Sequence, residues 1–142
     1  MIESFNLIIE DIKEKSIKVE MLTDAIENNS AGVIITDNNY KIIYVNKAFE
    51  VISGCLKEEL LGKDIKMLKS INISDKKYDE IISNINKGSC YYGEGIKVSR
   101  DGRKYIEYTQ ACPVFDEEGK LKYIIINKLN ITKKKLLEKN NT

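Results

Sequence analysis

Residues 91–131 read YYGEGIKVSRDGRKYIEYTQACPVFDEEGKLKYIIINKLNI, and this stretch decides the fold. Turn residues divide it into three runs rich in β-branched and aromatic side chains, at 91–99, 104–115 and 121–131. The dividers are Asp101-Gly102-Arg103 and Asp116-Glu117-Glu118-Gly119, which both have the composition of hairpin turns. The stretch therefore predicts three consecutive antiparallel strands.

Two shorter strands are predicted upstream. Residues 33–36 and 42–45 are apolar, β-branched runs, and Asp37-Asn38-Asn39 lies between them as a turn. Two such runs around a short polar turn indicate a β-hairpin. The chain therefore has five expected strands, two before and three after a central helical region.

The central region has the spacing of helices. Gly54 and Gly62 interrupt its first part, whereas Ser74 is a suitable N-cap for a second helix that ends at Gly88. The apolar positions expected to face the core are Ala48, Phe49, Ile52, Leu56, Leu60 and Leu61, then Tyr78, Ile81, Ile82 and Ile85.

The first 28 residues predict one amphipathic helix. Positions alternating by three and four residues are Ile2, Phe5, Ile9, Ile12, Ser16, Val19, Thr23 and Ile26. This is the spacing of a coiled-coil seam, so we expect a dimerising signal helix formed by Ile2, Phe5, Ile9, Ile12 and Val19. The pattern equally suits a helix lying on its own domain. With a further helix from Thr132 to about Lys139, the order of elements predicts one α+β domain with an antiparallel sheet and helices on one face.

Composition narrows the possible functions. The chain has 142 residues, about one domain, and a net charge of +1, which gives no reason to expect nucleic acid as a partner. No apolar run is long enough to span a bilayer, and the first residues lack the pattern of a secretory signal. The cysteines Cys55, Cys90 and Cys112 are odd in number and show no paired spacing, so we expect neither a disulfide nor a zinc site. These features favour a reducing cytoplasm.

Histidine is absent from the sequence. Its absence excludes histidine-based acid–base or nucleophilic catalysis, histidine-ligated metals, proximal-histidine haem and a phosphorylated histidine in this chain. The eight glycines are scattered and form no phosphate-binding loop. We therefore expect a protein that is not an enzyme and holds no metal.

Five short motifs follow one another along the chain. They are Asn46-Lys47-Ala48-Phe49, Glu58-Glu59-Leu60-Leu61-Gly62-Lys63, Arg100-Asp101-Gly102, Cys112-Pro113-Val114-Phe115-Asp116-Glu117-Glu118-Gly119 and Asn130-Ile131-Thr132-Lys133-Lys134-Lys135. In this order they resemble the PAS family. The resemblance covers Leu22 to about Glu138. It implies a five-stranded antiparallel sheet in the order 2-1-5-4-3, with helices enclosing a pocket against one face. Asn130 stands where the family usually has an aspartate that anchors the exit of the last strand.

The resemblance also implies a role and a division of the chain. We expect an N-terminal helix at 1–21, a PAS domain at 22–132 and the start of a signalling linker helix at 133–142. The expected function is a sensory input module, homodimeric, within a larger bacterial regulator such as a sensor histidine kinase. The alternative is a dimerisation scaffold without a ligand, in a diguanylate cyclase or transcription activator.

The same resemblance, with the absence of histidine, excludes a flavin photoadduct and a histidine-ligated haem and leaves any other cofactor unknown. Flavin-binding blue-light members carry an adduct-forming cysteine in a G-x-N-C-R-F-L motif, and the matching stretch here is Gly62-Lys63-Asp64-Ile65-Lys66-Met67-Leu68. Ile65 stands in place of the cysteine, so a flavin photoadduct is not expected there. Haem-binding members hold iron through histidine, which this chain lacks.

The resemblance and the apolar pattern disagree about which sheet face is inside. Turns at 101–103 and 117–118 place Glu107 opposite Lys97 on one side and Lys128 on the other. Pattern alone would bury the more apolar face, which carries Ile96, Val98, Ile106, Tyr108, Cys112, Val114, Tyr123, Ile125 and Leu129. The family register instead turns inward Lys97, Ser99, Tyr105, Glu107, Thr109, Ala111, Ile124, Ile126 and Lys128.

We follow the family register. The expected pocket residues are Thr36, Phe49, Lys97, Glu107, Thr109, Ile126 and Lys128. Two lysines around one glutamate leave one positive charge, which favours a small polar or anionic ligand with the threonines as hydrogen-bond donors. The alternative is an internal salt bridge in a pocket too small to bind anything.

Overall fold

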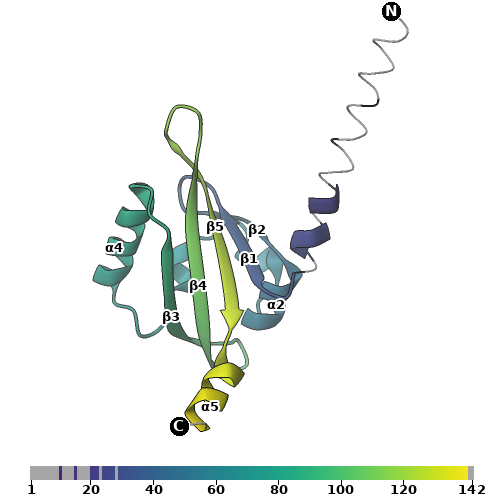
Figure 1. Ribbon diagram of the computed structural model, residues 1–142, viewed down its shortest axis with the longest axis vertical. Coiled ribbons are helices and arrows are strands. Elements are labelled where there is room, and N and C mark those ends of the chain that lie inside the picture. Colours follow the sequence, from purple (N-terminus) through teal and green to yellow (C-terminus); the bar gives the residue numbers. More distant parts are fainter. Residues whose placement is uncertain (1–9, 11–14, 16–19, 23, 28, 141–142) are drawn as a thin grey trace, which may run out of the picture.

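The computed structural model describes residues 10, 15, 20–22, 24–27 and 29–140 (Figure 1). Its elements follow the order expected from the sequence. They are β1 (Gly32–Thr36), β2 (Ile42–Val45), α2 (Lys47–Ser53), α3 (Lys57–Leu60), the 3₁₀ helix η1 (Ile65–Leu68), α4 (Asp75–Asn86), β3 (Tyr91–Val98), β4 (Lys104–Phe115), β5 (Leu121–Asn130) and α5 (Thr132–Asn140).

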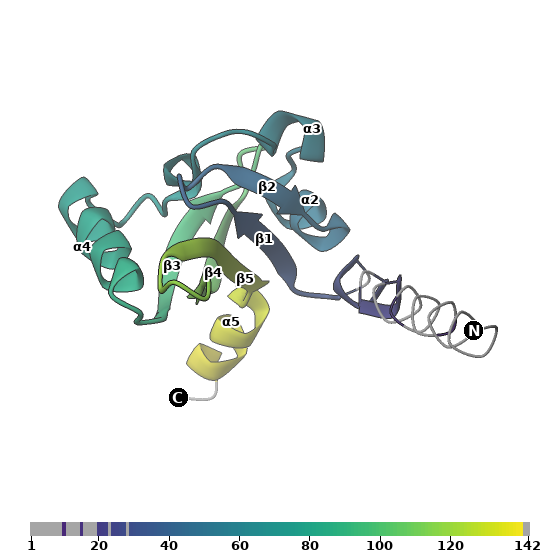
Figure 2. The same ribbon diagram turned by 90° about the horizontal axis from the view of Figure 1, so that it is seen from above.

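The five strands form one antiparallel sheet in the order β2-β1-β5-β4-β3, as predicted. Gly32, at the start of β1, lies opposite Lys128, near the end of β5. Figure 2 shows α2 and α3 beside the β1–β2 end of the sheet and α4 beside β3. The core joins these helices to one sheet face and consists of Ile34, Ile42, Val45, Phe49, Leu60, Leu68, Ile85, Ala111, Ile124 and Ile126.

Helix α4 begins and ends as its sequence predicts. The Ser74 hydroxyl accepts a hydrogen bond from the backbone N–H of Lys77, which satisfies one of the free amides of the first turn. Gly88 follows the helix with a φ of 104°, a conformation that glycine adopts without steric cost.

The turn between β3 and β4 lies one residue earlier than predicted. The Asp101 carboxylate accepts hydrogen bonds from the Ser99 hydroxyl and the Arg103 amide, and Ser99 and Arg103 also bond through their backbones. The loop is therefore residues 100–102. This moves the register by two, so that Glu107 faces Gly95 and Lys97 faces Tyr105.

The turn between β4 and β5 is longer than predicted. Asp116 accepts hydrogen bonds from the amides of Glu118 and Lys120 and closes a loop over residues 117–119. An irregularity between Val114 and Phe115 adds a further offset, so Lys128 lies opposite Thr109 and not opposite Glu107. Because both errors equal two residues, they leave each side chain on its expected face.

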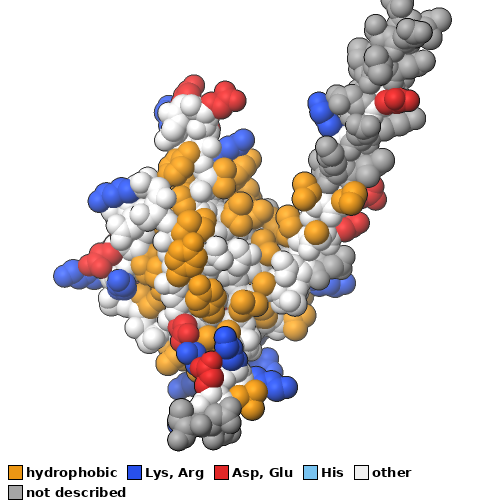
Figure 3. All heavy atoms as spheres, in the orientation of Figure 1, with side chains coloured by type: hydrophobic (Ala, Val, Ile, Leu, Met, Phe, Trp, Pro, Cys, Tyr) orange, Lys and Arg blue, Asp and Glu red, His pale blue; other side chains and the backbone are white. Residues whose placement is uncertain are grey.

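The family register correctly identifies the inner face. Ser99, Tyr105, Glu107, Ala111, Ile124, Ile126 and Lys128 are buried, with Lys97 and Thr109 half-buried. The outer face leaves an exposed apolar surface, drawn in orange in Figure 3, which includes Ile96, Val98, Tyr123, Ile125 and Leu129. The apolar pattern alone predicts the wrong inner face, because the helices pack on the less apolar face of the sheet.

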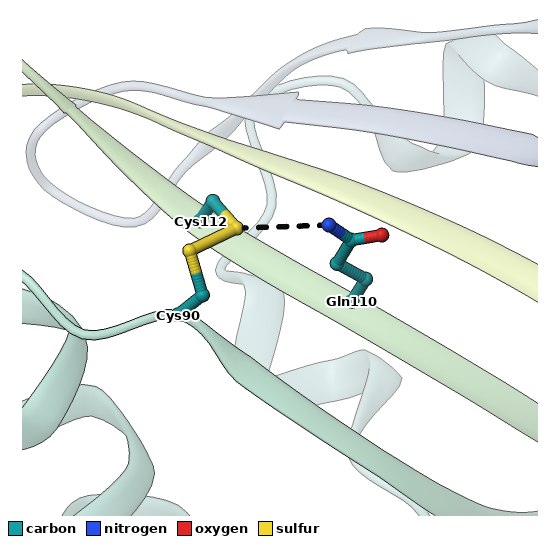
Figure 4. Close-up of a disulfide and its surroundings, with 3 residues drawn as sticks. All are labelled: Cys90, Gln110 and Cys112. Carbon is teal, nitrogen blue, oxygen red and sulfur yellow. Dashed lines mark hydrogen bonds between the residues drawn. A yellow bond between two sulfur atoms is a disulfide. The ribbon is translucent and has the colours of Figure 1, made fainter.

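The expectation of no disulfide is wrong. Cys90 and Cys112 form one, and their Cα atoms lie 4.3 Å apart (Figure 4). Tyr91 lies opposite Ala111 in the sheet, so the next pair outward is Cys90 and Cys112. The two-residue register error had placed Cys112 opposite Tyr92 and concealed this pairing.

The predicted dimer positions Ile2, Phe5, Ile9, Ile12 and Val19 lie outside the described residues. The part of the N-terminal segment that is described is helical at 20–22 and 24–27. No helix in the described part of the chain is both long and apolar enough to cross a membrane.

Candidate ligand-binding site

A cavity of about 80 Å³ lies between α4, η1 and the inner face of the sheet. Its walls are mainly apolar. Ile65 and Leu68 come from η1, and α4 contributes Tyr78, Ile81, Ile82 and Ile85. The sheet contributes Tyr91, Gly93, Glu94, Gly95, Thr109, Ala111, Ile124, Ile126 and Lys128, and the loop before α4 contributes Lys69, Ser70 and Ile73.

Lys128, on the floor of the cavity, belongs to a buried ion pair. The Lys128 ammonium donates to Glu107 Oε1 at 2.8 Å and to Thr109 Oγ1 at 3.0 Å. The side chains of Glu107 and Lys128 are 0% and 8% exposed, so each charge depends on the other for compensation. Glu107 Oε2 is buried and accepts no hydrogen bond from the described residues.

Tyr105 is buried on the same face as this pair. Burial, together with the neighbouring Glu107 carboxylate, raises the pKa of the Tyr105 phenol above its ordinary value. The phenol therefore stays protonated at neutral pH and adds no charge to the site.

Lys97 does not join the pair directly. Its ammonium donates to the backbone carbonyls of Leu68 and Lys69, at the end of η1. Burial and the nearby Lys128 lower the pKa of Lys97 to about 8. Glu107 was expected to balance the charge of at least one lysine, and in the structure that lysine is Lys128. Lys97 instead connects β3 to η1.

The structure brings only some of the predicted pocket residues to the cavity wall. Thr109, Ile126 and Lys128 line it, whereas Thr36, Phe49 and Glu107 are buried but do not line it. The Thr36 hydroxyl donates to the Asp37 carbonyl. Phe49 packs so closely under Gly32 that a β-carbon on Gly32 would lie 2.9 Å from its ring.

Sequence reasoning missed the roof of the cavity. The α4 stripe of Tyr78, Ile81, Ile82 and Ile85 was assigned to the core, yet all four line the cavity. Ile65 was aligned with the cysteine of flavin-binding members, and that alignment could have placed it at the wall. Within the described residues, no cluster of three or more potential ligands offers a metal site.

Backbone contacts connect the ion pair to the C-terminal helix. Ile106, the neighbour of Glu107, accepts a hydrogen bond from the Ile131 amide at 2.9 Å and donates one to Thr132 Oγ1 at 2.8 Å. Asn130 lies opposite Glu107, and its side chain accepts from the Thr132 amide at 3.1 Å. Asn130 thus still supplies an acceptor at the start of α5 where the family usually has aspartate.

Asn46 connects the other end of the domain to the core. Its side-chain oxygen accepts from the amides of Val33 and Phe49, at 2.8 and 3.1 Å. Its amide nitrogen donates to the carbonyls of Ile26 and Ala31, at 2.9 and 3.0 Å. One buried side chain therefore joins the N-terminal helix to β1 and α2.

Comparisons with known proteins agree with this fold. The family model described as PAS fold matches residues 20–127. A blue-light photoreceptor of Listeria monocytogenes is 30% identical over 112 residues, covering 77% of this chain and 44% of that protein. A nitrogen fixation regulatory protein of Klebsiella oxytoca is 26% identical over 113 residues, covering 80% and 23%. The chain thus spans less than half the length of these relatives.

A solved structure supports the same conclusion at the level of the fold. The PAS domain of a protein from Colwellia psychrerythraea superimposes with a TM-score of 0.71 at 24% identity, covering 81% of this chain and 98% of that one. The sheet order, the helices over its inner face and the match across residues 20–127 lead to one assignment. The chain belongs to the PAS family.

Proposed function

We propose that this chain is the sensory input module of a larger bacterial signalling protein such as a sensor histidine kinase. It responds to a small ligand in the cavity and relays the response through the helices at its two ends. One observation carries the proposal. The buried pair of Glu107 and Lys128 adjoins the backbone of Ile106, which holds the start of α5.

The cavity chemistry favours a less polar ligand than the polar or anionic one expected from the sequence. Most of the wall is apolar, and the main charged donor on it is Lys128, already neutralised by Glu107. An ammonium has three N–H donors, and two are used, by Glu107 and Thr109. We expect a small, largely apolar molecule with one hydrogen-bond acceptor, which binds the third N–H of Lys128.

A flavin does not suit these residues. The cavity of about 80 Å³ is well below the roughly 300–1,000 Å³ of sites for drug-sized ligands. Ile65, aligned with the adduct-forming cysteine, lies on the cavity wall and has no thiol. The relatives named as blue-light photoreceptors therefore share the domain with this chain, and we propose a different input for it.

A further group of features fits a module without catalysis. Histidine is absent, and the Thr109 hydroxyl beside the buried pair accepts a hydrogen bond from the Lys128 ammonium. The relay through α5 also uses an exposed ion pair, 3.1 Å long, between Lys135 and Glu94 of β3. We place the module in the cytoplasm, with the output domain of its parent protein as partner.

Native mass spectrometry of the freshly purified chain tests the ligand. We expect a stoichiometric additional mass on the wild type, retained in Lys120→Met, whose lysine lies in an exposed turn. The additional mass should be lost in Lys128→Met, because the hydrogen-bond acceptor of the ligand then loses its N–H donor in the cavity. A bare wild-type mass would contradict the ligand and favour the scaffold alternative.

The same spectrum reports the oligomeric state. We propose a homodimer formed through the predicted N-terminal helix, in which that helix or the partner subunit covers the exposed apolar face of the sheet. Ile125 and Leu129 lie on that face and are 37% and 41% exposed. Ile125→Lys should yield a monomer, whereas Val51→Lys, at an exposed apolar position on α2, should remain dimeric. A dimeric Ile125→Lys chain would show that this face is not the interface.

A further inference from the structure

The disulfide lies at the junction between α4 and the sheet. Cys90 occupies the link between the end of α4 and the first residue of β3, and Cys112 belongs to β4 (Figure 4). The Cα separation of 4.3 Å is that of the closer kind of directly opposed antiparallel pair. The two sulfurs therefore meet without any rearrangement of the strands.

The disulfide is open to reagents from solution. Cys90 is exposed and Cys112 is half-buried. Near it, the Gln110 amide lies 3.9 Å from Cys112 Sγ. The remaining cysteine, Cys55, packs against the core cluster and bonds to Ser53, so it belongs to a separate environment. Exposed disulfides exchange with external thiols more readily than buried ones.

The segment that carries Cys90 also anchors the last turn of α4. The Ser89 amide bonds to the Asn84 carbonyl, and the Gly88 amide bonds to the Ile85 carbonyl, both at 3.0 Å. A cross-link at Cys90 therefore holds the C-terminal end of α4 close to β4. Without it, the link is joined to the sheet through Tyr91, the first residue of β3, which pairs with Ala111.

The surface beside this link shares residues with the wall of the cavity. A surface groove beside the disulfide is lined by Lys77, Ile81, Asn84, Ile85, Ser89, Cys90 and Tyr91. Three of these residues, Ile81, Ile85 and Tyr91, also line the candidate ligand cavity. The same side chains thus face the disulfide groove on one side and the cavity on the other.

We propose that Cys90 and Cys112 form a redox-active pair that holds α4 over the cavity when oxidised and releases it when reduced. The module then reports thiol–disulfide state in addition to any ligand. Disulfides are rare in the cytoplasm, where we place the chain, and those that form there are usually transient and catalytic or redox-sensing, which is the behaviour proposed for this pair. The inference does not depend on whether a ligand occupies the cavity.

The reaction is exchange with an external dithiol. Its thiolate attacks Cys90 Sγ, the exposed sulfur, the Cys90–Cys112 bond breaks, and Cys112 leaves as a thiolate that takes up a proton. The second external thiol then attacks the mixed disulfide and frees Cys90, which is also protonated. Two electrons pass to the protein, and the dithiol becomes a disulfide. Oxidation by a small disulfide such as oxidised glutathione runs the same steps in reverse.

Hydrogen exchange measured by mass spectrometry tests the inference on the full chain. Samples are equilibrated with dithiothreitol or with oxidised glutathione, and alkylation verifies the state of each cysteine. We expect amide exchange across residues 81–91 to rise several-fold on reduction, while β1 and β5 change little. Cys55→Ser keeps the pair and should behave as wild type.

In the variants Cys90→Ser and Cys112→Ser, the amides of residues 81–91 should exchange under both conditions as fast as in the reduced wild type. This result separates loss of the disulfide bond from other effects of the reagents. Equal exchange of α4 in the two wild-type states would overturn the inference. So would alkylation of all three cysteines after treatment with oxidised glutathione. A chain that binds no ligand can still pass this test, so its outcome is independent of the proposed ligand.

Discussion

Lys128 lies opposite Thr109 in the sheet, and its ammonium reaches along β4 to Glu107 Oε1 at 2.8 Å. Diagonal neighbours on adjacent antiparallel strands are within reach of long side chains. The contact neutralises two buried charges beside the apolar core cluster, so neither residue can be removed alone without cost.

Lys128→Met should lower the free energy of unfolding by about 3–5 kcal/mol, because it leaves the Glu107 carboxylate buried without its cation. Urea unfolding followed by circular dichroism measures the loss. The combined change of Lys128→Met and Glu107→Leu should recover most of it, and Lys120→Met should have little effect. A stable single variant would mean that water reaches Glu107.

Asn46→Ala should lower the free energy of unfolding by about 2–4 kcal/mol, because the amides and carbonyls that Asn46 binds remain buried without partners. Hydrogen exchange should rise at Val33 and Phe49. Asn38→Ala, in the exposed turn between β1 and β2, is the matched control. Similar stability of the two variants would contradict this role.

Reduction of the disulfide should lower the free energy of unfolding by about 3 kcal/mol, the value expected for opening a loop of this length. Cys90 and Cys112 are 22 residues apart in the chain. Thermal unfolding with and without dithiothreitol should show a drop of several degrees in the wild type and Cys55→Ser. If Cys90→Ser showed the same drop on adding reductant, the effect would not come from this bond.

Lys97 should make stability depend on pH in the alkaline range. Its pKa is about 8 in the folded chain, below the unfolded value of about 10.4. Between these values the unfolded chain binds more protons at this residue, so the contribution of Lys97 to stability rises with pH. The slope is at most about 1.4 kcal/mol per pH unit.

This dependence is isolated by comparing the wild type with Lys97→Met in urea from about pH 7 to pH 10. The difference in unfolding free energy should shift in favour of the wild type as pH increases. Lys104→Met, which removes an exposed lysine of β4, should give a constant difference. A constant difference for Lys97→Met as well would show that the ammonium is solvated.

The strands and helix caps could be predicted from sequence because local chemistry determines them. Ser74 and Gly88 mark the ends of α4, and the three long strands lie within one residue of their expected limits. Register could not be predicted in this way. It depends on which backbone groups the carboxylates of Asp101 and Asp116 bind, and several nearby choices look equally good in sequence.

The candidate site was predicted in part for a related reason. Lys128 and Thr109 lie on the sheet face expected for them, because an even register error keeps side chains on their face. The roles of Lys97 and of the α4 stripe depend on how η1 and α4 lie over the sheet, which no local pattern encodes. The disulfide was missed because it requires the exact register of β3 and β4.

Gly32 and Lys128 are neighbours on adjacent strands, so the chain enters β1 and leaves β5 at one end of the sheet. Such partners lie about 5 Å apart. The whole segment between them can therefore be replaced by a short glycine–serine linker without separating the two flanking helices. Two chain connections at one end of a sheet are also the geometry that insertion of a folded unit into a surface loop requires.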